Sequence, residues 1–421
     1  MTEPNQPSHS AVTIRLRTRS ATAIAVFALS LLVTLATGRQ RGDFRIDEAH
    51  KLSETYYLRL AERGDFSNPA WFRSRVERAN PPVGKYLFGL AIRAAGLELP
   101  GDLAVAEEVN NGQRYPPPFA LPAYREMLMP VRLFTAVITA ATAAAIFLVG
   151  CSAGGLLAGI VATILYSTSF MAQAFAATAV FDPLLTFSVL LTILPVINMA
   201  KASRRSALWL MALGGALAGI ATQVRVTGLI ALAGLVAVAI VDALYRRPLR
   251  RAVTLCCLSA AVCLLVATAL NPYYWSDPSP SAVPPEFRAW QALPARIVDR
   301  YRLQLADLSF LLAREEAAQT ALRGMEKPRF VAEYLFGDWF GIMMLFGLAL
   351  AVAIPIATRR LDQPAAAMVA WSAAIVIILT AWLPLPYPRY VLVALPPAAL
   401  IAGYGWSALW RSVVEHLRPT R

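Results

Sequence analysis

The feature that most constrains this chain is a series of apolar blocks, each long enough to cross a lipid bilayer. A spanning α-helix needs about 20 mostly apolar residues. Ten such blocks occur, at 21–37, 131–149, 154–172, 183–199, 206–222, 226–243, 252–270, 339–357, 365–382 and 391–410. The sequence therefore predicts an all-α polytopic membrane protein with about ten transmembrane helices.

Composition excludes several other classes of protein. The chain is 57% hydrophobic and 15% charged, whereas soluble domains average about 45–50% apolar and about 25% charged residues. A disordered chain, a coiled coil and a nucleic-acid-binding domain are excluded, despite the net charge of +13. The four cysteines lie in or beside apolar blocks and the three histidines are scattered. We therefore predict no disulfide framework, no metal and no cofactor.

The positions of the basic residues predict the orientation in the membrane, because cytoplasmic loops carry the excess of Lys and Arg. With a cytoplasmic N-terminus, every basic cluster of the ten-span arrangement falls on one side. This gives a cytoplasmic tail at 1–20, a membrane domain at 21–410 and a cytoplasmic tail at 411–421. The basic residues of the cytoplasmic segments are Arg15, Arg17, Arg19, Lys201, Arg204, Arg205, Arg246, Arg247, Arg250, Arg251, Arg359, Arg360, Arg411, Arg418 and Arg421.

The first block has a second interpretation. Ala36 and Thr37 are small residues near a point where a signal peptide could be cleaved. An uncleaved first span fits the nine later spans better.

Two long segments, 38–130 and 271–338, fall outside the cytoplasm, and loops of this length are usually functional. Apolar spacing predicts a helix over Asp47–Arg63, an interfacial helix from Pro81 to Ala95 and a helical segment within Arg296–Met325. The last could be a lid or an interfacial helix. The aromatic run 271–275 is interpreted as part of an interfacial aromatic belt.

Several polar residues fall on the same external face. Asp47 and Glu48 open the first loop, where they could be a helix cap with a solvated acid or a general base near the membrane surface. Asp182 precedes a proline at a helix start, which is also typical of a simple N-terminal signal. Arg225 and Arg389 lie in short external links, where they could snorkel or bind an anion.

The combination matters more than any single residue. Carboxylates and arginines at a headgroup boundary suit a substrate with an anionic head and an apolar tail, such as a polyprenyl phosphate, since arginine binds phosphate through bidentate hydrogen bonds. We expect these residues to share one pocket.

The order of these motifs resembles a known group of enzymes. An Asp-Glu pair after the first span is followed by Pro-Pro-x-Gly-Lys-Tyr-Leu at 81–87, and Asp182-Pro183 heads a later helix. Arg225 precedes Thr-Gly between two spans, and Tyr-Pro-Arg-Tyr at 387–390 precedes the last span. The pattern resembles the GT-C-type, polyprenyl-phosphate-dependent glycosyltransferases, the group of protein O-mannosyltransferases and lipid A aminoarabinose transferases.

The resemblance implies transfer of a sugar from a polyprenyl-phosphate donor to an acceptor protein, lipid or polysaccharide outside the cytoplasm. Asp47 would be the general base of an inverting single displacement, and Glu48 would hold the acceptor. Candidates for the remaining roles are Arg225, Arg389 and Lys85 at the donor phosphate and Asp182, Tyr387, Tyr390 and His50 around the acceptor. Asn80 stands where many relatives have a histidine.

Two other functions stay open. One is a transporter or flippase for a lipid-linked or small solute, although such proteins place ionisable residues near mid-membrane, where these spans have almost none. The other is a non-catalytic member of the same fold. Lysine supplies only four of the 39 basic residues, which is typical of a GC-rich bacterial genome, so we predict a location in a bacterial inner membrane.

Overall fold

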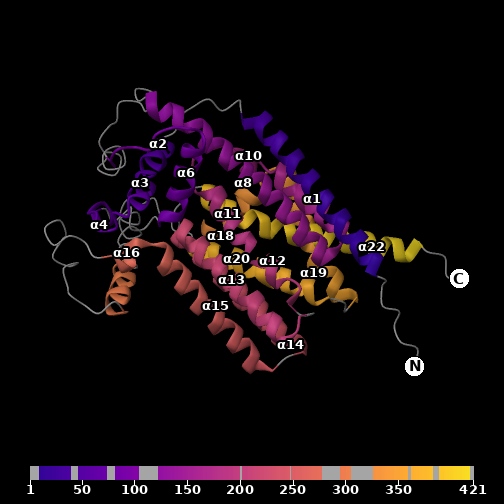
Figure 1. Cartoon of the computed structure of the whole chain (residues 1–421). Helices are drawn as coiled ribbons and strands as arrows, with labels where there is room; N and C mark the ends of the chain where they lie inside the picture. The colour runs from indigo at the N-terminus through magenta and orange to yellow at the C-terminus, as the bar shows by residue number, and fades with distance from the viewer. Residues whose placement is uncertain are drawn as a thin grey trace.

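The computed structural model describes residues 9–38, 46–73, 81–103, 122–199, 202–246, 248–276, 294–304, 326–358, 362–382 and 388–417. Within these ranges the regular structure is helical, and no strand occurs (Figure 1). The predicted all-α membrane fold is confirmed.

In the part of the chain that the structure describes, seven helical segments are long and apolar enough to cross a membrane. Six of the ten predicted blocks match single helices: α1 (His9–Gly38), α8 (Pro122–Gly154), α13 (Arg204–Val224), α14 (Ile230–Arg246), α15 (Leu249–Leu270) and α20 (Gln363–Trp382). Here α14 is extended at its start by η3 (Val226–Leu229). The seventh runs through α21 (Pro388–Val391), η5 (Leu392–Ala394) and α22 (Leu395–Leu417).

Three predicted spans take other forms. The block 339–357 forms α19 (Trp339–Thr358), which meets α18 (Glu326–Phe336) at a bend of 110° and adds an eighth candidate span if the pair is one unit. The blocks 154–172 and 183–199 form short helices: α9 (Leu156–Thr168), α10 (Phe170–Phe175), α11 (Asp182–Leu191) and α12 (Ile193–Val196). A total of ten spans therefore stays a prediction.

Glycine explains why α9 separates from α8. Gly155 has φ +84°, a conformation that ends the long helix and that L side chains rarely adopt. A Cβ on Gly150 would lie 2.7 Å from the Cα of Gly159. The two backbones therefore touch, as small residues permit between membrane helices.

The bundle has two distinct ends (Figure 1). Five short helices gather at its upper left: α2 (Ile46–Ser53), α3 (Tyr56–Glu62), α4 (Ala70–Arg73), α6 (Pro82–Ala94) and α16 (Pro272–Trp275). The arginine-bearing starts of α13 and α15 and the end of α22 lie toward the lower right. The cytoplasmic assignment of that second end stays a prediction.

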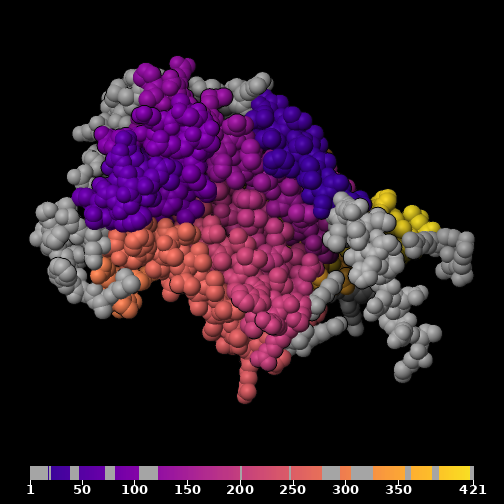
Figure 2. All heavy atoms as spheres, viewed as in Figure 1, coloured from indigo at the N-terminus to yellow at the C-terminus, as the bar shows by residue number. Residues whose placement is uncertain are grey.

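Residues 46–73 and 81–103 of the first loop fold as a cap on the bundle, seen as the violet atoms at the upper left of Figure 2. The helix expected over 47–63 is two helices, because a turn at Glu54 and Thr55 separates α2 from α3. The Thr55 hydroxyl donates a hydrogen bond to the Leu52 carbonyl at 2.6 Å. Glu48 and Glu54, expected to lie off the apolar stripe, are fully buried.

One expectation about interfacial elements is wrong and another stays a prediction. α6 is a helix as predicted and packs closely against the protein: a Cβ on Gly84 would lie 2.9 Å from the Phe181 ring and one on Gly89 would lie 2.7 Å from Leu58. Its position in the membrane interface stays a prediction. Tyr273 and Tyr274 are buried rather than arranged in an exposed aromatic belt. Of the proposed lid over 296–325, only 296–304 lies within the described residues, and it is helical.

Candidate functional site

Asp47 and Arg389 form an ion pair that joins the two ends of the sequence. Asp47 lies in the first turn of α2 and Arg389 in α21, 342 residues later. The Arg389 guanidinium donates a hydrogen bond to the Asp47 carboxylate. The Asp47 side chain is 54% exposed, so its carboxylate can be reached from outside the protein.

A second arginine–carboxylate pair lies beside the first. Arg225, just after α13, donates to Asp182 at the start of α11. The guanidinium of Arg225 also stands 4.9 Å from the ring centroid of Tyr390 and 3.4 Å from its hydroxyl. Arg389 approaches the same ring at 5.7 Å, so Tyr390 connects the two pairs.

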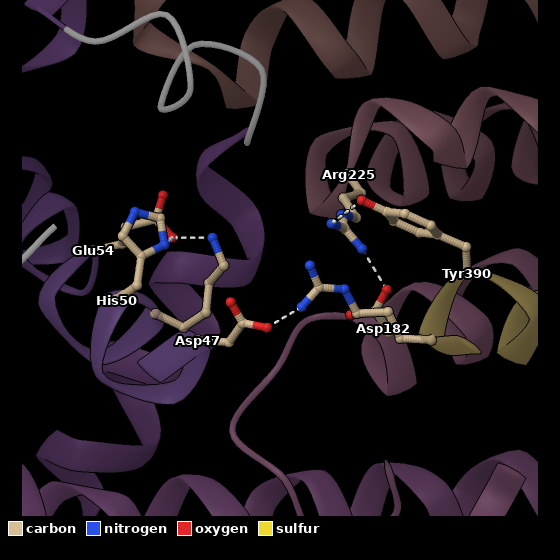
Figure 3. Close-up of polar contacts among 8 residues, drawn as sticks. Asp47, His50, Glu54, Asp182, Arg225 and Tyr390 are labelled. Carbon is tan, nitrogen blue, oxygen red and sulfur yellow. Dashed lines mark hydrogen bonds and ion pairs between the residues drawn. The ribbon is translucent and has the colours of Figure 1, made fainter. Parts of the chain in front are cut away.

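Figure 3 shows how these groups lie. Asp47 stands between the buried His50 and Glu54 on one side and Asp182, Arg225 and Tyr390 on the other. Four chain segments that are far apart in sequence therefore contribute to one polar site. The site lies at the capped end of the bundle.

Glu48 lies on the inner side of the same helical turn, and its surroundings are quite different. It is completely buried and accepts two hydrogen bonds from the Arg132 guanidinium, at 2.9 and 2.7 Å. The backbone N–H of Ala179 donates a third, at 2.8 Å. Because Arg132 belongs to α8 and Ala179 precedes α11, Glu48 ties the Asp47 helix to the segment that carries Asp182.

Glu54 is the centre of a second buried ionic cluster. Lys51 lies 2.5 Å from one of its carboxylate oxygens and Lys85 lies 3.1 Å from the other. The Lys85 ammonium also stands 4.2 Å from the Tyr57 ring centroid. The Nδ1 atom of His50 is 3.8 Å from Glu54. Two lysines against one carboxylate leave this cluster with a net positive charge next to Asp47.

The electrostatics of this cluster are set by burial and by its charges. Burial, with the Lys51 charge beside it, lowers the pKa of His50 to about 4, so the imidazole is neutral at pH 7. Burial also lowers the pKa of Lys51, against the opposing effect of Glu54. The pKa of Glu54 stays well below its usual value: burial opposes ionisation, but Lys51 and Lys85 outweigh it.

The predicted site residues thus fall into three settings. The residues that meet at the capped end of the bundle are Asp47, Arg389, Tyr390, Arg225 and Asp182. His50 and Lys85 lie in the buried cluster around Glu54, and Glu48 is held by Arg132 instead of facing an acceptor. Tyr387 lies outside the described residues.

Sequence reasoning missed three participants: Lys51, Glu54 and Arg132. The signal for Arg132 was available, because a lone arginine inside an apolar block is costly unless it is paired. Within the described residues, no group of three or more His, Cys, Asp or Glu side chains could hold a metal ion.

Solved structures share this fold. ArnT from Cupriavidus metallidurans bound to undecaprenyl phosphate superposes with a TM-score of 0.55 at 16% identity, over 96% of this chain and 63% of that one. A second match is the archaeal oligosaccharyltransferase AglB from Archaeoglobus fulgidus, in complex with an inhibitory peptide and a dolichol-phosphate. It superposes with a TM-score of 0.53 at 12% identity, over 95% of this chain and 52% of that one. This chain thus spans less than two thirds of either protein. No curated protein sequence matches it.

The helical bundle of this chain thus has the GT-C fold of these two structures. Residues 24–271 match the family of dolichyl-phosphate-mannose-protein mannosyltransferases, and the chain belongs to that family. The resemblance inferred from the motifs is confirmed.

Proposed function

We propose that this protein is a glycosyltransferase that moves a sugar from a polyprenyl-phosphate donor to an acceptor hydroxyl on the extracytoplasmic side of a bacterial inner membrane. The observation that carries the proposal is the contact between the accessible carboxylate of Asp47 and Arg389, in a chain of the mannosyltransferase family. The arginine clusters at the opposite end of the bundle support the orientation.

The chemistry needs one base and one cationic clamp. The acceptor oxygen attacks the anomeric carbon while Asp47 takes its proton, and the bond from that carbon to the phosphate oxygen breaks. The polyprenyl phosphate leaves as a stable anion, so no acid has to protonate it. Attack opposite the leaving group inverts the anomeric centre.

The arginines supply the clamp. Arg389 binds the leaving phosphate in place of Asp47, and Arg225, which stays paired with the buried Asp182, adds positive charge beside it. Both guanidinium groups stabilise the charge that develops on the phosphate. Lys85 and Lys51 add positive potential near Asp47, because these two cations share the single carboxylate of Glu54. Tyr390 keeps the two guanidinium groups together, and Asp182 holds Arg225 in place.

The experiment uses membranes from a deletion strain that expresses the full chain, with polyprenyl-phosphate mannose labelled in the sugar as the first probe. We expect label in acceptor material together with release of polyprenyl phosphate. Asp47→Asn is expected to reduce transfer about 10³-fold with folding retained. Glu62→Gln is the matched control, since this acid of α3 is surface-exposed and pairs with Arg93.

Two results would contradict the proposal. Full transfer by Asp47→Asn would remove the assigned base. Movement of a labelled polyprenyl-phosphate sugar across vesicles, with no covalent product from this or any other sugar donor, would favour a flippase.

A further inference from the structure

A cavity lies at the end of the bundle opposite the candidate site. It has a volume of about 320 Å³ and opens between the starts of α13 and α15. Its lining includes three arginines, Arg204, Arg250 and Arg251, and the apolar side chains of Leu208, Pro248 and Leu255. α13 has 21 residues, so at 1.5 Å per residue Arg204 is roughly 30 Å from Arg225. The cavity is therefore separate from the site.

The cavity is positively charged. One of its lining arginines has an acidic partner: the Asp242 carboxylate is 3.0 Å from the Nε atom of Arg251. That pairing leaves Arg204 and Arg250, both exposed, as uncompensated cations within the described residues. The first turns of two long helices, with their partly positive N-termini, meet at the same place.

Arg251 is the side chain that indicates a ligand. It is only 10% exposed, and its Nη2 atom is buried with no hydrogen-bond partner in the described part of the chain. A buried donor on a charged group normally has an acceptor, because an unmade hydrogen bond there is costly. A phosphate oxygen in the cavity would be such an acceptor.

The surroundings of the cavity fit a lipid. Trp209 is 70% exposed and Leu249 is 74% exposed, and each directly adjoins a lining residue in sequence. Val253, one helical turn after Leu249 on α15, is 55% exposed. A phosphate in the cavity would thus lie next to an apolar surface that faces the hydrocarbon of the bilayer.

We propose that this cavity binds the phosphate group of an anionic membrane lipid in the leaflet away from the candidate active site. Arg204 and Arg250 attract the headgroup, Arg251 donates through Nη2, and the acyl chains lie along the exposed face of α13 and α15.

The test titrates the purified full chain in neutral detergent with phosphatidylglycerol and counts bound lipids by native mass spectrometry. Phosphatidylcholine is the zwitterionic comparison. The double variant Arg204→Gln/Arg250→Gln should lose at least about tenfold in affinity for phosphatidylglycerol. Arg205→Gln is the matched control, because Arg205 is the exposed neighbour of Arg204 outside the cavity lining. The affinity of this control variant for phosphatidylglycerol should change less than twofold.

Three results would overturn the proposal: equal binding of the two lipids, equal losses in the double variant and the control, or binding of inorganic phosphate alone with the same arginine dependence and no binding of phosphatidylglycerol. The last would identify a soluble anion as the ligand. Sugar transfer by the double variant should stay within twofold of the unaltered protein, so the outcome is independent of the proposed function.

Discussion

Asp47 and Glu48 are neighbours in sequence and have opposite surroundings. Asp47 is half exposed and faces Arg389 across the open side of the site, whereas Glu48 is fully buried and holds Arg132 and a backbone N–H. Successive residues of a helix point about 100° apart, so one turn of α2 presents one carboxylate to the substrate side and the other to the protein interior.

This difference in exposure indicates which ion pairs can exchange partners. An accessible pair can give up its arginine to an incoming phosphate, because water and ligand can replace the lost contact. A buried pair cannot be broken without leaving an uncompensated charge, which is costly. We therefore assign Glu48 to positioning and Asp47 to chemistry.

The largest effect should come from breaking the inner pair. Glu48→Gln leaves the Arg132 guanidinium without its buried counter-charge, and should destabilise the protein by about 3–5 kcal/mol. The free energy of unfolding, measured in mixed micelles, tests this prediction. Glu62→Gln removes a surface carboxylate and should cost less than about 1 kcal/mol. Equal losses of stability in the two variants would contradict the assignment of Glu48 to a buried, structural ion pair.

Breaking the outer pair should affect activity and spare stability. Arg389→Gln should lower kcat/KM for sugar transfer about 10²–10³-fold, because the leaving phosphate loses a cationic donor. The free energy of unfolding should change by less than about 1 kcal/mol, as expected for an exposed pair. A large loss of stability with normal kcat/KM would show that Arg389 is structural.

Acid should weaken the buried cluster through His50. The unfolded chain takes up a proton at His50 near the ordinary histidine pKa of 6.5, whereas in the folded chain the pKa of His50 is about 4. The unfolded state thus binds more protons in this window, and stability falls as pH falls. Between pH 6.5 and 5 the loss should be about 1.6 kcal/mol. Unfolding of His50→Gln should not show this slope; an unchanged slope would place its origin elsewhere.

The smallest effect should come from changing the shape of a cation while keeping its charge. Arg225→Lys keeps a positive group near Asp182 and Tyr390 but loses the planar fork that contacts both. We expect kcat/KM to fall about tenfold, less than for Arg225→Gln. If both variants kept the kcat/KM of the unaltered protein, neither the charge nor the shape of this side chain would matter.

Much of the arrangement could be predicted from the sequence. Apolar length identified the helical membrane fold, and the positions of arginines predicted that Asp47, Asp182, Arg225 and Arg389 would share one end of the bundle. The structure brings these four together. Their roles stay proposals.

The partners of each charge could not be predicted, for a physical reason. Helical periodicity indicates which face of α2 is apolar, and Glu48 and Glu54 were expected to lie off it. Both are buried because Arg132, Lys51 and Lys85 neutralise them. Lys51 lies three residues before Glu54, but Arg132 and Lys85 are distant in sequence from their partners, and such pairs leave no trace in local spacing. The short form of α9 was missed because hydropathy measures apolar content, whereas this helix ends at Ser169, which has an extended backbone and caps α10.

The uninterrupted length of α13 has a mechanical consequence. Arg204 and Arg225 stand at opposite ends of one straight rod, roughly 30 Å apart, which equals the hydrocarbon thickness of an average bilayer. Neither guanidinium can change its depth without moving the other. A thinner or thicker membrane must therefore tilt the rod or deform around it, so the lipid environment sets the height of Arg225, which is proposed to lie beside the donor phosphate.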